Sequence, residues 1–297
     1  MKRWIIAAAL IALSLSASAF QPRTGHWNNI TAESGRGFNI DIQDGVMVLT
    51  MYAYDQNGNA QWYIASGNMS NGQRSFTGTL DKFVNGQCNQ CGPQAPQSAG
   101  NDGVISVAFD TEISATVTLP GGRTTRITPF NFKYGDPPGG MLGSWVFTEQ
   151  IGAVGFADAY TFNHTVNVSL ANTNGLMVMN AANTTGCVYE IAGTLAGTLV
   201  CAHNFSSGGT EGYGFRFGLD ETYSGLYLST SGTAYPMKGM RTGSASGFTK
   251  SLDKPSDRAD LKSMVEDPTA PMASGELMGV IRDLAERLKE PSALTQP

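Results

Sequence analysis

Two-residue turn signals divide the first half of the chain at short intervals. Asp44-Gly45 separates GFNIDI from VMVLTMYAY, and Asn57-Gly58 separates that segment from AQWYIAS. Both dipeptides accept the positive φ angles of a type I′ turn, so each predicts a β-hairpin. Consecutive hairpins form an antiparallel sheet, because parallel strands need longer crossover connections. The turn spacing therefore restricts this region to an antiparallel all-β fold.

Strand-like segments continue to the end of the same region. They read SFTGTLDKF, VISVAFD, ISATVTL and RTTRITPFNF, and Gly121-Gly122 turns the last pair. The result is a meander of about eight strands within about 110 residues. An open meander exposes two edges, whereas closure into a barrel removes both. We therefore expect an up-and-down β-barrel over residues 20–134.

The opening of this region is repeated later in the chain. GHWNNITAESGRGF (25–38) and GSWVFTEQIGAVGF (143–156) match without a gap at Gly25 and Gly143, Trp27 and Trp145, Gly37 and Gly155, and Phe38 and Phe156. The turn-rich GDPPGG (135–140) lies between the two regions and is interpreted as a linker. Residues 141–243 continue with strand-like segments. We interpret them as a second, diverged barrel produced by internal duplication.

The repeated tryptophans suggest how each barrel is closed at one end. A large side chain is needed there, and we expect Trp27 and Trp145 to be the two plugs. A basic residue from the last strand of each barrel could cap the indole by a cation–π contact. The candidates are Arg126 in the first barrel and Arg241, or alternatively Lys238, in the second.

The Gly-x-Trp opening, the strand count and the basic residue near the last strand resemble the calycin group, which contains the lipocalins and avidins. A closer resemblance is to secreted proteobacterial modules with no assigned activity. Their pattern is found here as Gly25-Trp27-Asn29, Gly35-Gly37-Phe38, Tyr54-Asp55-Gly58-Trp62-Tyr63 and Phe76-Gly78-Leu80, with Arg126 near its end. This resemblance covers residues 25–132 and implies a β-module without indicating a reaction.

The turn positions also predict which side chains share a face of the sheet. A two-residue turn at Asn57-Gly58 places Tyr52 opposite Tyr63 and Ala53 opposite Trp62. One face then forms a core of Phe38, Ile40, Ile42, Met47, Leu49, Met51, Trp62 and Ile64. The other face carries the candidate ligand-binding residues Asn39, Asp41, Tyr52, Tyr54, Gln61 and Tyr63. Such aromatic and polar groups suit stacking on sugar rings or a contact with another domain. An ordinary outer barrel surface is the alternative.

The first 19 residues are typical of a secretory signal peptide. Lys2 and Arg3 precede an apolar run that is too short for a permanent membrane span, and Ala17-Ser18-Ala19 fits a cleavage site. We expect a periplasmic or extracellular protein without a transmembrane segment after cleavage. Loss of Lys2 and Arg3 makes the formal net charge of −5 two units more negative. An acidic chain without a basic cluster is a poor match for nucleic acid.

The four cysteines are expected to form two disulfides in an oxidising compartment. Cys187 and Cys201 flank a hairpin centred near Thr194, so their side chains fall opposite each other on paired strands. Cys88 and Cys91 have C-x-x-C spacing but lie within a loop-like segment. A small structural disulfide is favoured there over a redox centre. A zinc site would need a second C-x-x-C knuckle, so no metal is expected.

The composition changes after residue 243. Residues 244–297 begin with a polar, proline-broken stretch that we interpret as a flexible linker. SGELMGVIRDLAERLKE then places Leu277, Ile281, Leu284 and Leu288 at helical spacing, which predicts an amphipathic helix over 275–290 with Ser274 as a cap. The helix could dock on the rest of the chain or bind a protein partner.

The sequence shows little sign of catalysis. The three histidines are scattered, and there is no Gly-x-Ser-x-Gly motif with them. We therefore expect no catalytic residues and no cofactor. The favoured function is non-catalytic binding of a small molecule or glycan. A structural or protein-interaction module of the cell envelope is the second hypothesis, and a hydrolase with a dispersed triad is the third.

Overall fold

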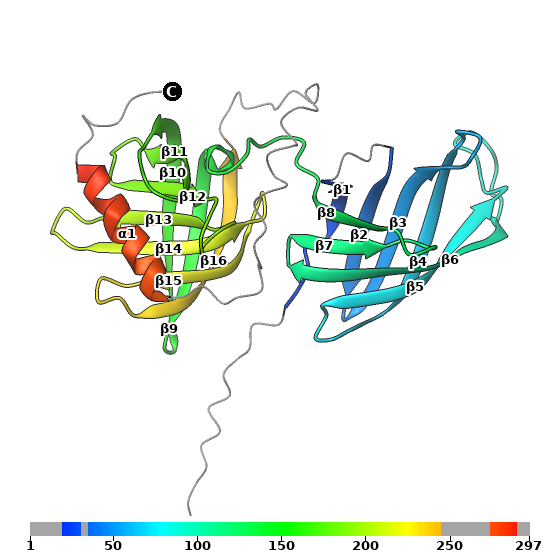
Figure 1. Cartoon of the computed structure of the whole chain (residues 1–297), viewed down its shortest axis with the longest axis horizontal. Helices are drawn as coiled ribbons and strands as arrows, with labels where there is room; N and C mark the ends of the chain where they lie inside the picture. The colour runs from blue at the N-terminus through cyan, green and yellow to red at the C-terminus, as the bar shows by residue number, and fades with distance from the viewer. Residues whose placement is uncertain (1–19, 31–34, 245–273, 290–297) are drawn as a thin grey trace, which may run out of the picture.

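The computed structural model describes residues 20–30, 35–244 and 274–289. It consists of two closed antiparallel barrels of eight strands each, and one helix lies on the outside of the second barrel (Figure 1). This confirms the expected all-β fold. The expected signal peptide and the linker up to residue 273 fall outside the described residues. Within the described part of the chain, no helix is long and apolar enough to cross a membrane.

The first barrel is an uninterrupted meander in which each strand pairs with the next and the last pairs with the first. Its strands are β1 (Gly25–Asn29), β2 (Gly37–Gln43), β3 (Val46–Tyr54), β4 (Ala60–Ser70), β5 (Ser75–Val84), β6 (Gln97–Thr111), β7 (Ser114–Thr118) and β8 (Thr124–Pro129). The ring is closed where β1 runs antiparallel to β8, with Trp27 opposite Pro129. No sheet edge remains along this closure.

The second barrel repeats the meander after a short 3-10 helix, η1 (Gly139–Met141). Its strands are β9 (Gly143–Ile151), β10 (Val154–Asn167), β11 (Thr173–Asn180), β12 (Thr185–Glu190), β13 (Leu199–Asn204), β14 (Thr210–Phe217), β15 (Thr222–Leu228) and β16 (Ala234–Ser244). It closes through β9 and β16, where Trp145 is opposite Arg241. The strands of the two barrels extend over Gly25–Pro129 and Gly143–Ser244.

The Gly-x-Trp motif performs the same task in both barrels. Trp27 and Trp145 are fully buried, and each indole N–H donates to the carbonyl of the residue four positions earlier, Arg23 at 3.1 Å and Met141 at 2.9 Å. The glycines between have φ angles of 109° at Gly25 and 118° at Gly143. Only glycine adopts such angles without strain. The glycine therefore turns the chain from the segment beneath the barrel into the first strand.

The expected basic cap is present in one barrel only. The Arg241 guanidinium lies 4.4 Å from the Trp145 ring and donates to the carbonyls of Gly140 and Leu142. Lys238, the alternative, pairs with Glu221 at 3.4 Å.

The assignment of Arg126 as the cap of Trp27 is wrong. Arg126 donates to Asp110 at 2.9 Å and to Ser114 at 2.7 Å. It lies between the buried Thr125 and Ile127, so strand alternation directs it to the outer face.

The two phenylalanines of the repeated opening, Phe38 and Phe156, do not occupy equivalent positions in the structure. Phe38 is buried and pairs with Trp27, whereas Phe156 is 50% exposed and pairs with Glu149. The residue opposite Trp145 is Tyr160. The reason is strand length. Because β9 has 9 residues and β1 has 5, the residue that pairs with the tryptophan lies farther along the chain in the second barrel.

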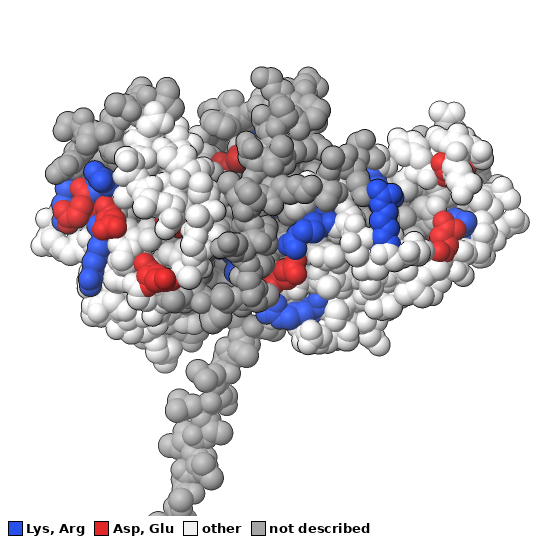
Figure 2. Space-filling view, viewed as in Figure 1, with Lys and Arg blue, Asp and Glu red and all other residues white. Residues whose placement is uncertain are grey.

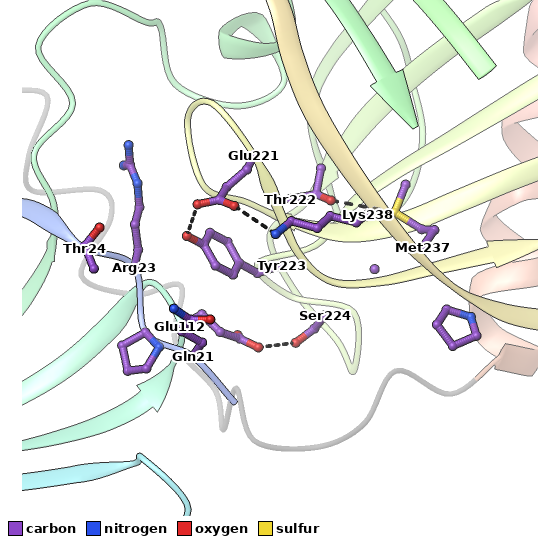
Figure 3. Close-up of a pocket in the computed structure, with 13 residues that line it drawn as sticks. Gln21, Arg23, Thr24, Glu112, Glu221, Thr222, Tyr223, Ser224, Met237 and Lys238 are labelled. Carbon is purple, nitrogen blue, oxygen red and sulfur yellow. Dashed lines mark hydrogen bonds and ion pairs between the residues drawn. The ribbon is translucent and has the colours of Figure 1, made fainter. Parts of the chain in front are cut away.

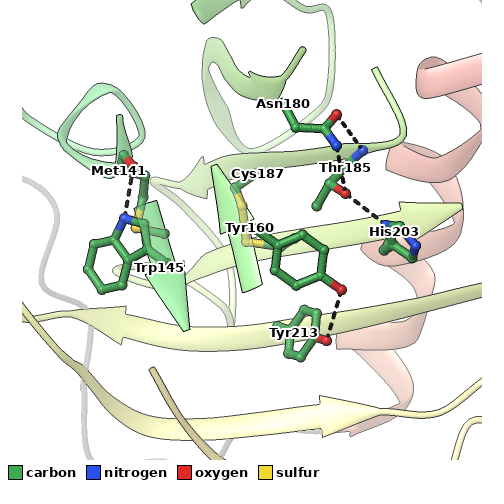
Figure 4. The surroundings of a disulfide bond; sticks show 9 residues. Met141, Trp145, Tyr160, Asn180, Thr185, Cys187, His203 and Tyr213 are labelled. Carbon is green, nitrogen blue, oxygen red and sulfur yellow. Dashed lines mark hydrogen bonds between the residues drawn. A yellow bond between two sulfur atoms is a disulfide. The ribbon is translucent and has the colours of Figure 1, made fainter. Parts of the chain in front are cut away.

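Both predicted disulfides are present. Cys187 and Cys201 are directly opposite on β12 and β13, with a Cα–Cα distance of 4.0 Å, and their side chains are buried in the second barrel (Figure 4). Cys88 and Cys91 are joined within the exposed loop between β5 and β6. The first bridge joins two adjacent strands of the second barrel, while the second constrains one turn of a loop.

The helix α1 (Ser274–Lys289) covers the outer face of the second barrel, which matches the docked alternative. Its apolar face is fully buried against β12, β13 and β14 through Leu277, Ile281, Leu284 and Leu288. Gly212 and Gly214 allow this close approach, because a Cβ atom there would lie within 2.6 Å of Ile281 and Leu277. The opposite face of α1 is charged (Figure 2). A partner could use the apolar face only after the helix undocks.

Candidate functional site

The loop between β3 and β4 decides which side chains face outward from the first barrel. The Asp55 backbone N–H donates to the Asn59 carbonyl, and Gly58 has a φ of 81°. Three residues are therefore left in the loop, which is the type I turn with a glycine bulge rather than a type I′ turn. The Asp55 carboxylate accepts hydrogen bonds from the backbone of Asn57 and Asn59 and from the Asn59 amide. The hydrogen bonds from Asn59 come first among the causes that lower the pKa of Asp55.

This loop shifts β4 by one position from the expected register. Tyr52 pairs with Trp62, and Met51 pairs with Tyr63. A shift of one residue moves every side chain of a strand to the opposite face. The placement of Tyr63 on the outer face and of Trp62 and Ile64 in the core is therefore wrong. Tyr63 is 7% exposed and belongs to the core, whereas Trp62 is 46% exposed.

A shallow groove lies on the outer face of β3 and β4. Tyr52 and Tyr54 are 49% and 60% exposed, and together with Trp62 they supply its aromatic lining. Gly35, Arg36, Gly37, Ala53, Ala60 and Gln61 complete the lining, and the volume is about 520 Å³. The groove therefore combines three aromatic side chains with an amide and a guanidinium group.

The aromatic groups of the groove differ in how closely their neighbours pack against them. The Trp62 ring stacks on Phe83 of β5, with ring centroids 6.1 Å apart. The Tyr54 ring lies 3.4 Å from the position that a Cβ atom would occupy on Gly35, which is an ordinary van der Waals distance. The Gln61 side chain donates to the Trp62 carbonyl at 3.0 Å. Trp62 is therefore fixed by its stacking partner Phe83, whereas Tyr54 is largely exposed.

Only part of the predicted candidate set reaches the groove. Tyr52, Tyr54 and Gln61 line it, but Asn39 and Asp41 on β2 do not, and they hydrogen-bond to each other at 3.0 Å. Tyr63 points into the barrel, where burial first and then a hydrogen bond to Asp102 raise its pKa. Trp62 was predicted to lie in the core because Asn57-Gly58 was interpreted as a two-residue turn. The acceptor Asp55 before that dipeptide was the signal for the longer loop.

A second cleft, of about 360 Å³, lies between the two barrels (Figure 3). The plugged ends of the barrels meet there: Arg23 is 3.6 Å from Asp220, and Ser224 donates to Glu112 at 3.0 Å. Tyr134, before the linker, donates to Asp220 at 2.6 Å. These groups are engaged with one another across the junction. The cleft is therefore better explained as an interface between barrels than as a ligand site.

The described residues do not assemble a metal or nucleophilic centre at the groove. No group of three or more His, Cys, Asp or Glu side chains in the described part of the chain is arranged to hold a metal ion. The groove offers ring faces for stacking and polar groups for hydrogen bonds.

No protein-family model, curated protein or solved structure matches this chain. The resemblance to the secreted proteobacterial modules therefore depends on the motif residues alone.

Proposed function

We propose that this chain is an exported, non-catalytic binding protein that recognises glycans through the groove on the first barrel. The observation that carries the proposal is the exposure of Tyr52, Tyr54 and Trp62 in one groove. Monomeric proteins rarely leave several large aromatic groups exposed together unless they contact a partner. The two disulfides and the sequence of residues 1–19 support export, because disulfides persist in oxidising compartments.

A glycan fits the groove better than a purely apolar ligand. Sugar rings have C–H faces that stack on aromatic rings, and their hydroxyl groups need hydrogen-bond partners. Trp62 and the two tyrosines supply the stacking surfaces, while Gln61 and Arg36 lie beside them. The shallow form of the groove also suits a ligand that extends along a surface.

The test is a glycan-array screen of the purified chain, followed by calorimetric titration of the best oligosaccharide. Trp62→Ala should weaken binding about tenfold, since stacking adds about 0.5–1.5 kcal/mol to the loss of buried area. Tyr52→Ala should weaken it less. Phe156→Ala is the matched control, because Phe156 is equally exposed but lies on the second barrel.

Two outcomes would contradict the proposal. One is a positive array result that Trp62→Ala leaves unchanged. The other is capture of a protein partner through the same residues without any glycan binding, which would favour the interaction-module hypothesis. Native mass spectrometry of protein from its own host would reveal a retained ligand.

A further inference from the structure

Three inward-facing carboxyl groups lie at the end of the second barrel away from Trp145, which we call its mouth. Glu149 on β9 is 5% exposed, Glu211 on β14 is 6% exposed, and Asp158 on β10 is half-buried. Glu149 shares its face of β9 with the buried Trp145 and Phe147. The three groups thus project into the barrel from three strands.

Tyrosine side chains surround these carboxyl groups. Tyr213 donates to Asp158 at 3.1 Å, and Tyr227 donates to Glu211 at 2.8 Å. The Tyr160 hydroxyl lies 3.2 Å from that of Tyr213 (Figure 4). The ring centroids of Tyr213 lie 5.5 Å from Tyr227 and 5.9 Å from Tyr160. The mouth is therefore a site of acidic groups held between aromatic rings.

Among the described residues, no lysine or arginine forms an ion pair with Glu149, Asp158 or Glu211. Glu149 Oε2 is buried and has no hydrogen-bond partner. Burial first, then the hydrogen bond to Asp158 and the charges of Asp158 and Glu211, raise the pKa of Glu149 to about 8. Near neutral pH the proton on Glu149 therefore takes the place of a counter-charge, and a cation that displaced it would restore the pairing that buried carboxylates normally have.

We propose that the mouth of the second barrel binds a primary alkylammonium ligand. Its N–H groups would donate to Glu149, Asp158 and Glu211, and its charge would lie against the tyrosine rings, which attract cations. The half-buried Asp158 and Tyr160 mark the side open to solvent. A metal ion is a poorer occupant, because these groups lack metal-ligand geometry. The site is independent of the groove on the first barrel.

Binding should be coupled to loss of a proton. An ammonium group favours the ionised form of Glu149, whose neighbours are Asp158, Glu211 and the three tyrosines, with His203 on β13 beside Tyr160. Burial lowers the pKa of His203, so it is neutral and does not repel the ligand near neutral pH. Affinity should therefore rise between pH 6 and pH 8, as estimated from linkage.

The experiment is calorimetric titration of the full chain with n-butylammonium and 1,4-diaminobutane, and with n-butanol as the uncharged probe. The two amines should bind and the alcohol should not. The heat of binding measured in phosphate should differ from that in Tris, because the released proton is taken up by buffers with different ionisation enthalpies. Glu149→Gln should weaken amine binding more than about tenfold, as loss of a buried charge partner does. Glu149 holds its proton near neutral pH, so the neutral glutamine of similar shape should leave the fold intact, and thermal melting checks this.

Asp41→Asn is the matched control, since Asp41 is an exposed acid on the first barrel. Absence of heat with both amines would overturn the proposal. Equal affinity for n-butanol and n-butylammonium, or unchanged affinity in Glu149→Gln, would also overturn it. Trp62→Ala should leave amine binding intact, so failure here and failure of the glycan proposal can be told apart.

Discussion

The two barrels close in the same way but differ in what their inner and outer faces carry. Among the described residues of the first barrel, the interior is aliphatic and aromatic and contains no buried acid, and Tyr52, Tyr54 and Trp62 lie outside. In the second, tyrosines and acidic groups occupy the interior, and apolar residues outside are covered by α1. Ring closure and the tryptophan plug thus specify the fold, while the face that carries the polar and aromatic groups is free to change.

The largest effect is expected where the barrels agree. Trp27→Ala and Trp145→Ala should each lower the free energy of unfolding by about 3–5 kcal/mol, because each removes a buried indole. Trp145→Ala should cost more, since Arg241 then loses its ring contact. Hydrogen exchange measured by mass spectrometry reports each barrel separately. If β1 and β8 stayed protected from exchange in Trp27→Ala, Trp27 would not stabilise the first barrel as Trp145 stabilises the second.

The next effect should distinguish the barrels by their outer faces. Ile281→Ala should lower the free energy of unfolding by about 2–4 kcal/mol, because Ile281 of α1 is buried against Gly212 of β14. Denaturant unfolding measures this, and hydrogen exchange should place the loss in β12 to β14. Arg282→Ala, on the exposed side of α1, is the control. An equal effect of the two changes would contradict the docked helix.

Paired substitutions on β3 and β4 test which face of the first barrel is the core. Tyr63→Ala should cost about 2–3 kcal/mol through loss of a buried ring, whereas Tyr52→Ala should change stability by less than about 0.5 kcal/mol. Thermal melts measure both. Equal costs would mean that the register through the Asp55 loop is different.

The smallest effect concerns pH. The pKa of Glu149 is raised to about 8 and that of Glu190 to about 7, both chiefly by burial. The folded second barrel therefore holds more protons than the unfolded chain between pH 5 and pH 8, so its stability should fall by about 1–2 kcal/mol as the pH rises. In the first barrel the pKa values of Asp55 and Asp102 are lowered, so its stability should change only below about pH 4.

Urea unfolding at pH 5, 6.5 and 8, followed by hydrogen exchange, separates the two barrels. Glu149→Gln should reduce the pH dependence of the second barrel. Equal pH dependence in both barrels would remove the contrast between their interiors.

Much of the fold could be predicted because local turn chemistry determines it. Asp44-Gly45 forms the expected two-residue turn, with both residues at positive φ and Ile40 opposite Leu49. Cys187 and Cys201 pair because the hairpin centre lies midway between them. The candidate groove was found only in part, because the side chain of Asp55 lengthened one loop by one residue and exchanged Trp62 for Tyr63.

The polar mouth of the second barrel could not be predicted for a different reason. Strand alternation normally directs apolar residues inward, but β13 and β14 place Val200, Ala202, Gly212 and Gly214 outward. These positions look like core residues, and they are buried only because a helix more than 60 residues later covers them. Packing of α1 on the outer face thus places the small and apolar residues of β14 outward, and the alternating residues Glu211 and Tyr213 point into the barrel.

The docked helix also has a consequence for the order in which the chain is made. Synthesis proceeds from the N-terminus, and domains generally fold as units as they emerge. The first barrel can close once β8 is complete, whereas the second has its apolar outer wall uncovered until residues 274–289 arrive. During that interval, and in any product truncated before α1, this wall is a surface for self-association. Docking of α1 removes this surface from solvent in the folded chain.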